Sequence, residues 1–467
     1  MAYVSPMTSA IERPVRDAKA TFAAAERLHG EGRFVEAERL LSEAVIEWPT
    51  DVSLRNARGV MFASMRRHLD AVWCYRDALK CDPTAGGVWS NLGNVLTQLN
   101  YLDSAIVCHQ TAISLSSETD PLLFQNLGVS LAEAGRHGEA VIAFSKAIEL
   151  KPDYHTARWD RALSRLVLGN YREAWPDYEA RKLTGQLPTR KLPGVEWNGA
   201  PYSGRRLLLV SEQGFGDAIW IARYLPRVKA LGGDLTIECR SELAPLIERM
   251  GVADRIIAPG TSVDADLHAY VCSLPSFFTQ EFATIPGAPY LSAAPGRVRE
   301  MSPLFAGAGR QLKVGIVWSG SVTFGKNRRR AQKLLNFFQA CALPGVELYS
   351  LQKGPPIKEL TSLPRGGPIK DLAPYLHDFA DTAAAISHLD LVVMTDSAVA
   401  HLTGALGKPV WVLLGHSAHW LWLENRSDSP WYPSMKLYRP RAEGDWDHVF
   451  DQVSADLMKL VHHRQNS

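Results

Sequence analysis

The chain has 467 residues, which at about 150 residues per domain predicts roughly three domains. Hydrophobic residues make up 46% and charged residues 21%, which excludes a mostly disordered chain, a collagen and a small disulfide-stapled fold. Lys and Arg number 51 against 49 Asp and Glu, so the net charge is only +2. That balance argues against a dedicated nucleic-acid binder or a polybasic membrane anchor.

The six cysteines are scattered without a CxxC pair or a nearby Cys/His cluster. This spacing favours reduced thiols in a cytoplasmic protein over structural zinc. Residues 1–6 lack the basic and apolar regions of a signal peptide, and no apolar run approaches the ~20 residues that span a bilayer. We therefore expect a cytoplasmic chain with no membrane span.

A repeat of about 34 residues runs through the N-terminal part. Ala37, Ala71, Ala105, Ala140 and Ala174 are spaced 34, 34, 35 and 34 residues apart. Two further series keep the same step, including the single-residue slip: Ala44, Ala78, Ala112 and Ala147, and Gly59, Gly93 and Gly128. Small residues at fixed offsets in such a period predict two close-packed antiparallel helices per repeat.

This pattern resembles the tetratricopeptide repeat. The resemblance predicts about five repeats over residues 16–185, stacked into an α-superhelix with a concave groove. Such grooves usually bind a peptide or a protein. The alternative is that the array binds no partner protein. It would then only support the rest of the chain or join two copies of it into a homo-oligomer.

The C-terminal part alternates short apolar runs with helical stretches. Runs such as 207–210 and 235–238 are typical of buried parallel strands, and a second series begins at 314–318. This order predicts two Rossmann-like lobes, over residues 186–310 and 311–467, with ligands at the carboxyl ends of the strands. A last helix, about 446–462, is long enough to cross back onto the first lobe.

The first candidate site follows the first strand of the 186–310 lobe, at residues 212–217. Gly214 and Gly216 permit a tight turn and a close backbone approach, and Asp217 adds a carboxylate. A dinucleotide-binding loop is a competing interpretation, with Glu238 as its acidic ribose ligand. The third glycine position, however, holds Ile219. A helix cap is the structural alternative for Asp217.

The second candidate is the end of the strand at 391–394 and the short helix after it. Asp396 and Ser397 have helix-capping side chains, and free amides at Ala398 could hold a phosphate. His401 lies about one turn further, as either a core residue or a phosphate contact.

Three other clusters complete the candidates. The basic run 326–330 contains Arg328, Arg329 and Arg330 and is either a solvated face or a phosphate contact. Residues 350–354, including Gln352, could form a ledge for a nucleotide. Four aromatic residues fit core packing better than sugar stacking: Trp420, Trp422, Trp431 and Tyr432.

With these motifs, the second half resembles the ADP-heptose:lipopolysaccharide heptosyltransferases, which have the GT-B glycosyltransferase fold. The shared motifs are the Gly216-Asp217 loop and the stretches 396–402 and 404–409. The whole chain is similar to bacterial proteins that join tetratricopeptide repeats to this module, some of them associated with flagellin glycosylation. Residues 175–181, 378–383 and 428–433 match that subgroup.

The resemblance implies site roles. Asp217 would be the general base that takes the acceptor proton, and the helix near Asp396, His401 and the arginine run would stabilise the leaving phosphate. Gln352 and Asp381 would help to hold the nucleotide and its ribose. GT-B enzymes generally need no divalent metal, so the resemblance implies no metal and no cofactor beyond the nucleotide-sugar substrate.

The combined expectation is a metal-independent glycosyltransferase that moves a sugar from a nucleotide sugar to a hydroxyl of a protein acceptor, with flagellin as the candidate. Two alternatives remain open. The acceptor could be a lipopolysaccharide or capsule precursor, or the chain could be an inactive repeat scaffold. Ser397-Ala398 stand where the family has Thr-Gly, which leaves the donor sugar open.

Overall fold

The computed structural model describes residues 17–466 except 117–118, 186, 188–189, 213, 324, 326, 363–366 and 417. The side chain of Arg328 is also outside this description. The chain divides into two compact units, Met1–Arg161 and Ala162–Ser467. Each unit is described by itself.

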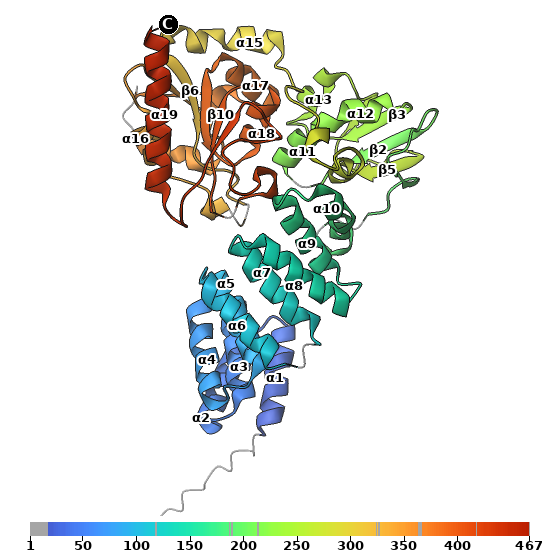
Figure 1. Cartoon of the computed structure of the whole chain (residues 1–467), viewed down its shortest axis with the longest axis vertical. Coiled ribbons are helices and arrows are strands. Elements are labelled where there is room, and N and C mark those ends of the chain that lie inside the picture. Colours follow the sequence, from blue (N-terminus) through green and yellow to red (C-terminus); the bar gives the residue numbers. More distant parts are fainter. Residues whose placement is uncertain are drawn as a thin grey trace, which may run out of the picture. The chain divides into compact units, whose positions relative to one another are not determined.

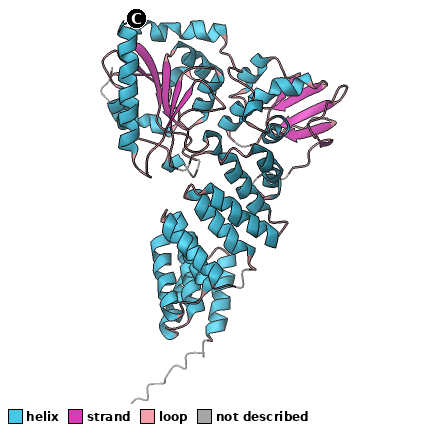
Figure 2. Ribbon diagram, viewed as in Figure 1, coloured by secondary structure: helices cyan, strands magenta, loops and turns pink. Residues whose placement is uncertain are grey.

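The first unit is built of consecutive helix pairs (Figures 1 and 2). Within the described residues its helices are α1 (Ala18–Gly30), α2 (Phe34–Glu47), α3 (Val52–Ser64), α4 (His68–Cys81), α5 (Gly86–Gln98), α6 (Leu102–Ser114), α7 (Pro121–Glu133) and α8 (His137–Leu150). Aspartates at residues 17, 51 and 120 cap α1, α3 and α7 by accepting a backbone N–H. The expected helical repeats are confirmed.

The glycine series explains how the helices of a pair approach each other. In each of three repeats, a glycine of the first helix faces a ring of the second. A Cβ on these glycines would lie 2.4 to 2.6 Å from the nearest ring atom. The three pairs are Gly59 with Tyr75, Gly93 with His109 and Gly128 with Phe144. Only glycine leaves room for the ring, and so the period in sequence is a period in packing.

The second unit contains two parallel sheets, each of which defines a lobe. The first lobe is built on a five-stranded sheet of order β1-β5-β2-β3-β4. Its strands are β1 (Val195–Glu196), β2 (Arg206–Val210), β3 (Asp234–Glu238), β4 (Arg255–Ile257) and β5 (Leu267–Tyr270). All described pairings in this sheet are parallel, as expected for apolar strands covered by helices.

The second lobe is built on a six-stranded sheet of order β11-β10-β9-β6-β7-β8. Its strands are β6 (Leu312–Val317), β7 (Val346–Ser350), β8 (Ile369–Asp371), β9 (Leu391–Thr395), β10 (Val410–Leu413) and β11 (Met435–Tyr438). The mixed architecture of a repeat superhelix followed by parallel α/β lobes is confirmed.

Helices cover both sheets and join them to the end of the repeats. They are α9 (His155–Val167), α10 (Tyr171–Tyr178), α11 (Phe215–Ile221), α12 (Leu225–Ala230), α13 (Ala244–Met250), α14 (Leu274–Phe278), α15 (Pro295–Met301), α16 (Leu334–Cys341), α17 (Phe379–His388), α18 (Ala398–Ala405) and α19 (Trp446–Asn466). α9 begins in the first unit and ends in the second. No described helix is both long and apolar enough to cross a bilayer.

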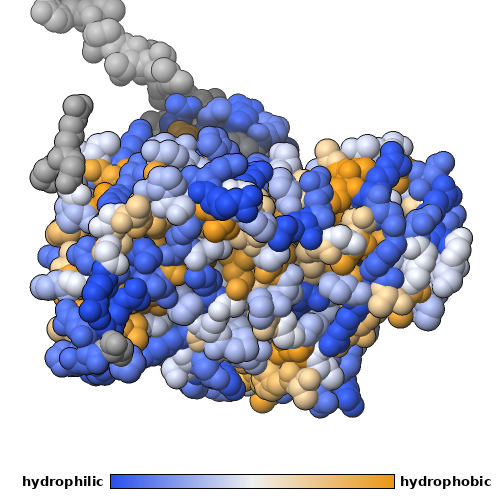
Figure 3. All heavy atoms as spheres, turned by 90° about the horizontal axis from the view of Figure 1, so that it is seen from above, coloured by the Kyte–Doolittle hydropathy of each residue, from blue (hydrophilic) through white to orange (hydrophobic). Residues whose placement is uncertain are grey.

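The last helix does not cross between the lobes as the sequence suggested. The buried residues of α19, among them Val453 and Leu457, belong to the core of the second lobe together with Val314 and Phe337. Its amphipathic pattern showed that one face is buried but not which lobe buries it. The face drawn in Figure 3 mixes apolar with hydrophilic residues, as soluble domains usually do.

Candidate functional site

The loop that carries Asp217 is a helix-capping turn at the carboxyl end of β2. Gly214 is the N-cap of α11, and its backbone N–H donates to Asp217 Oδ2 over 3.0 Å. The carboxylate of Asp217 is half-buried, so it can cap its own helix and still face solvent or a ligand. Asp217 therefore does cap its helix, and this cap is compatible with a catalytic role of the same carboxylate.

Gly216 brings the first two candidate motifs together. A Cβ built on Gly216 would lie 3.0 Å from His401 Cδ2 and 3.7 Å from the Cα of Ala398. α11 of the first lobe thus packs directly on α18 of the second lobe. A side chain at residue 216 would press on the His401 ring, and so the glycine favours this close approach, one residue before Asp217.

Unpartnered polar atoms gather at the carboxyl ends of β6 and β9. Thr395 ends β9, and Ser397 is the N-cap of α18 without a side-chain capping bond. Asn327 Oδ1, Thr395 Oγ1 and Ser397 Oγ are buried, and none has a hydrogen-bond partner among the described residues. Buried groups of this kind normally find a partner, and the first amides of a helix are also unsatisfied. These groups could bind a ligand with several oxygens.

His401 is a neutral imidazole held by aromatic residues. It is 7% exposed, stacks on Trp422 with ring centroids 5.0 Å apart, and its Nδ1 lies 3.0 Å from the hydroxyl of Tyr432. Burial lowers the pKa of His401 to about 3, so it carries no charge near neutral pH. A phosphate contact from His401, as the resemblance implies, would therefore be a hydrogen bond from a neutral ring.

A chain of hydroxyl groups leads to Nδ1 of His401. Tyr290 Oη donates to the carbonyl of Ile219 over 3.1 Å and lies 3.3 Å from Tyr432 Oη. Because the proton of Tyr290 is used there, the proton of Tyr432 is available for His401 Nδ1. When Tyr432 donates to Nδ1, the ring proton is on Nε2, the nitrogen that faces Gly216.

The arginine run contributes one described side chain to the site. Arg330 Nη1 donates to Asp396 Oδ2 over 3.0 Å, and Asp396 is buried. Arg329 is half-buried in the same turn, and its carbonyl approaches Gly415. The side chain of Arg328 lies outside the described residues. The ion pair with Asp396 places the Arg330 guanidinium at the carboxyl end of β9.

Gln352 is buried and already uses its amide group on the backbone. Its Oε1 accepts from the N–H groups of Trp318 and Ser319, at 3.1 and 3.0 Å. Its Nε2 donates to the carbonyls of Ser319 and Lys353, at 3.1 and 2.8 Å. Every hydrogen-bonding position of the amide is filled. The side chain cannot hold a nucleotide without breaking one of these bonds, and it instead fixes the loop after β6.

Asp381 is likewise occupied in the first turn of α17. It accepts from Arg297 Nη1 over 2.7 Å and from the backbone and ring N–H of His377. Burial alone would raise the pKa of Asp381, but the bonds from His377 and the Arg297 guanidinium hold it below the usual range. The predicted ribose contact would have to compete with these partners.

The four aromatic residues from 420 to 432 are buried, as core packing predicts, and they pack across the lobes. Trp431 contacts Trp220 of the first lobe with centroids 5.4 Å apart. Arg223, which no sequence motif singled out, donates to the carbonyl of Trp431 over 2.9 Å and lies 4.7 Å from the ring centre of Tyr432. These contacts hold His401 and its neighbours against α11.

The dinucleotide interpretation loses its acidic ligand. Glu238 is buried and accepts from Arg190 Nη2 over 2.5 Å. It also accepts from the backbone N–H groups of Ser211 and Gly260. The carboxylate that would bind a ribose is therefore committed to holding two loops of the first lobe.

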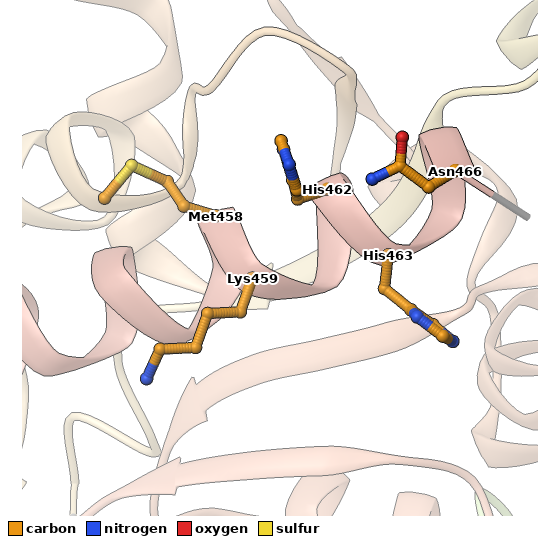
Figure 4. Close-up of a pocket in the computed structure, with 5 residues that line it drawn as sticks. All are labelled: Met458, Lys459, His462, His463 and Asn466. Atoms are coloured by element: carbon orange, nitrogen blue, oxygen red, sulfur yellow. The ribbon is translucent and has the colours of Figure 1, made fainter.

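A separate pocket of about 520 Å³ lies along α19, away from these motifs (Figure 4). The close-up shows five side chains of one helix pointing in different directions: Met458, Lys459, His462, His463 and Asn466. A ligand site needs polar groups that converge from opposing walls, and here the lining comes from a single helix. We therefore place the candidate site between α11 and α18.

Comparisons with known proteins agree with this division of the chain. Residues 123–154 match a tetratricopeptide-repeat model, and residues 358–438 match glycosyltransferase family 9 (heptosyltransferase). The second match contains α17, β9, α18 and β10, the elements that carry Asp381, Asp396 and His401. The chain thus has one segment that matches tetratricopeptide repeats and another that matches glycosyltransferase family 9, as the sequence motifs suggested.

Individual relatives cover either most of the chain or only its repeats. Protein FlbA of Caulobacter vibrioides is 27% identical over 440 residues, which cover 88% of this chain and 73% of that protein. The peroxisomal targeting signal receptor of Candida albicans is 34% identical over 109 residues, which cover 23% of this chain and 17% of the receptor. The solved structure of YrrB, described as a TPR protein with an unusual peptide-binding site, covers 36% of this chain and 87% of its own at 21% identity and a TM-score of 0.31.

Proposed function

We propose that this protein is a glycosyltransferase that moves a sugar from a nucleotide sugar to a hydroxyl of a protein acceptor bound by the repeat array. The observation that supports it best is the contact of Gly216 with His401. This contact sets the carboxylate loop of one lobe beside the unsatisfied polar atoms of the other. Transfer needs a base for the acceptor and an anion site for the donor, and this arrangement supplies both.

Asp217 is the proposed general base. The acceptor oxygen forms a bond to the anomeric carbon, and its proton passes to Asp217. The bond from that carbon to the diphosphate oxygen breaks, and its electron pair leaves with the diphosphate. The half-buried carboxylate is tied to the loop by the N–H of Gly214, which orients it without burying it.

The donor diphosphate is proposed to bind at the start of α18. The free amides at Ala398 and Val399, the hydroxyl of Ser397 and the guanidinium of Arg330 supply donors there. His401 adds a neutral N–H, and Arg328 and Arg329 are proposed as outer contacts. Gln352 and Asp381 are not proposed to contact the donor. Gln352 holds the backbone of the loop after β6, and Asp381 belongs to the first turn of α17.

The acceptor, the location and the metal independence belong to the same proposal. The repeats support a protein partner, and flagellin is the candidate that the family resemblance implies. The six free cysteines support a cytoplasmic protein. Because the proposed leaving-group contacts are amides and an arginine, we expect transfer in the presence of EDTA.

The test is transfer measured by mass spectrometry on the intact acceptor. Purified protein is incubated with flagellin and a panel of ADP-, UDP- and GDP-linked sugars, with and without EDTA. The proposal predicts a mass increase of one sugar residue for the wild type and for Asp234→Asn, a control at the amino end of β3. It predicts none for Asp217→Asn. Equal transfer by Asp217→Asn, or transfer only to a saccharide acceptor, would contradict it.

A further inference from the structure

The segment that ends the repeats places one arginine beneath the loop of Asp217. After α10, the 3₁₀ turn Glu179–Leu183 buries Arg181, which is 2% exposed. Its Nε and Nη2 form a two-point ion pair with Glu212, at 3.1 and 2.9 Å. Glu212 follows β2 and stands two residues before Gly214. The ion pair therefore anchors the start of the loop that Asp217 closes.

Every N–H of this guanidinium has a partner. Nη2 also donates to Ser273 Oγ over 2.9 Å, and Nη1 donates to Glu179 Oε1 and to the carbonyl of Tyr178. Together with the two bonds to Glu212, this accounts for all five donors of the side chain. A buried arginine that is satisfied in this way fixes its neighbours in one geometry.

Glu212 is satisfied from a second side as well. Its Oε1 accepts the backbone N–H of Cys272 over 2.9 Å, and that residue lies in the turn after β5. Burial, and then the charges of Glu212 and Asp217, raise the pKa of the Cys272 thiol. Glu212 is thus held between the Arg181 guanidinium and the backbone of the turn after β5.

We infer that Arg181 is a positioning residue for the transfer reaction: through Glu212 it anchors the carboxyl end of β2, next to the turn in which Gly214 binds the Asp217 carboxylate. The inference rests on the proposed function for its catalytic meaning, and on the ion pair for its geometry. It assigns the end of the repeat sequence to the catalytic machinery of the second unit, in which Arg181 lies.

The test separates geometry from charge in the full-length protein. Arg181→Met removes the guanidinium, Arg181→Lys keeps the charge without the two-point contact, and Arg181→Met with Glu212→Gln leaves no buried charge unpaired. The control is Asp177→Asn, which alters a buried ion pair of α10 with Arg165 and does not touch Glu212. All are compared by hydrogen exchange of residues 208–219 and by transfer kinetics.

The double variant should fold, exchange faster over 211–219 than the wild type, and lose on the order of 100-fold in kcat with the donor KM unchanged. Arg181→Met alone should destabilise the protein more than the double variant does, because it leaves the Glu212 carboxylate buried without its counter-ion. Arg181→Lys should restore neither the slow exchange nor kcat, because an ammonium group cannot form the two-point contact with Glu212. Asp177→Asn should match the wild type in the loop.

A double variant that folds with wild-type exchange over 211–219 and wild-type kcat would overturn the inference. The exchange measurement does not depend on turnover. If the wild type transfers no sugar, the proposed function fails, whereas unchanged loop exchange in the double variant would contradict the anchoring role of Arg181 by itself.

Discussion

His109 places a neutral imidazole in a slot that its neighbouring repeats fill with phenyl rings, and this sets up a measurable pH dependence. The ring lies over Gly93 as Tyr75 lies over Gly59 and Phe144 over Gly128. It is 1% exposed, and neither ring nitrogen has a hydrogen-bond partner among the described residues. Each buried unsatisfied group costs about 1–3 kcal/mol. His109→Phe should therefore stabilise the array near neutral pH.

The acid behaviour follows from the pKa. Burial lowers the pKa of His109 from 6.5 to about 4. As pH falls through 6.5, the unfolded chain takes up a proton that the folded chain refuses until about pH 4, so stability falls with pH across that window. At about 1.4 kcal/mol per pH unit, the wild type loses about 3 kcal/mol by pH 4. His109→Phe should not show this loss.

The assay is urea unfolding of the full chain at pH 7.5, 6.0 and 5.0, followed by pulsed hydrogen exchange on peptides of α5 and α6. His137, whose pKa burial also lowers to about 4, is present in both proteins and cancels. The reciprocal change Phe144→His should add the same pH dependence to α7 and α8. Parallel movement of the wild-type and His109→Phe midpoints between pH 7.5 and 5.0 would refute the reasoning.

Three further predictions concern the site. Asp217→Asn removes the proposed base but keeps the shape of the side chain, so it should lower kcat by about 10²–10⁴ and leave the thermal midpoint near that of the wild type. A kinetic assay with Asp234→Asn as the control measures this loss. Tyr432→Phe removes the hydroxyl at His401 Nδ1 and should lower kcat about tenfold, whereas Tyr438→Phe should not; equal rates would contradict the tautomer assignment. Arg330→Gln should weaken binding of the donor nucleotide about tenfold by calorimetry, and unchanged affinity would remove Arg330 from the donor site.

The repeat array was the part of the fold most open to prediction. Small residues at a fixed period are direct evidence of close helix contacts. At Gly59, Gly93 and Gly128 an aromatic ring of the next helix occupies the space that a side chain would take. Central strands such as β2 and β9 were equally visible, because both of their faces are buried and their sequences are continuously apolar. The short edge strands β1 and β8 lack this pattern and were not predicted. The lobe that receives α19 was not, since an amphipathic helix shows a buried face without identifying its partner.

The candidate site was predicted in its parts and not in its connections. Strand ends predicted where Asp217 and His401 lie, but the neutral state of His401 depends on Trp422 and Tyr432, which are 21 and 31 residues further on. Gln352 and Asp381 were selected by position, and their side chains turned out to serve the backbone and an ion pair. Local patterns carry no information on such long-range partners.

The ion pair of Arg181 with Glu212 is a second long-range contact that local sequence patterns could not predict. They are 31 residues apart, on either side of the boundary expected at residue 185. Arg181 stood in a stretch noted only because it matched a subgroup of repeat-containing proteins. Its bond to the loop of Asp217 could be found only when the burial of both charges was known.

The central claim is that Asp217 and the start of α18 form one transfer site, and intact mass spectrometry of the acceptor tests it most directly. With flagellin and the nucleotide-sugar panel, the account predicts a discrete mass increase for the wild type and for Asp234→Asn, and none for Asp217→Asn. An acceptor that gains the same mass with Asp217→Asn, or that gains none with the wild type across the whole panel, would contradict the account.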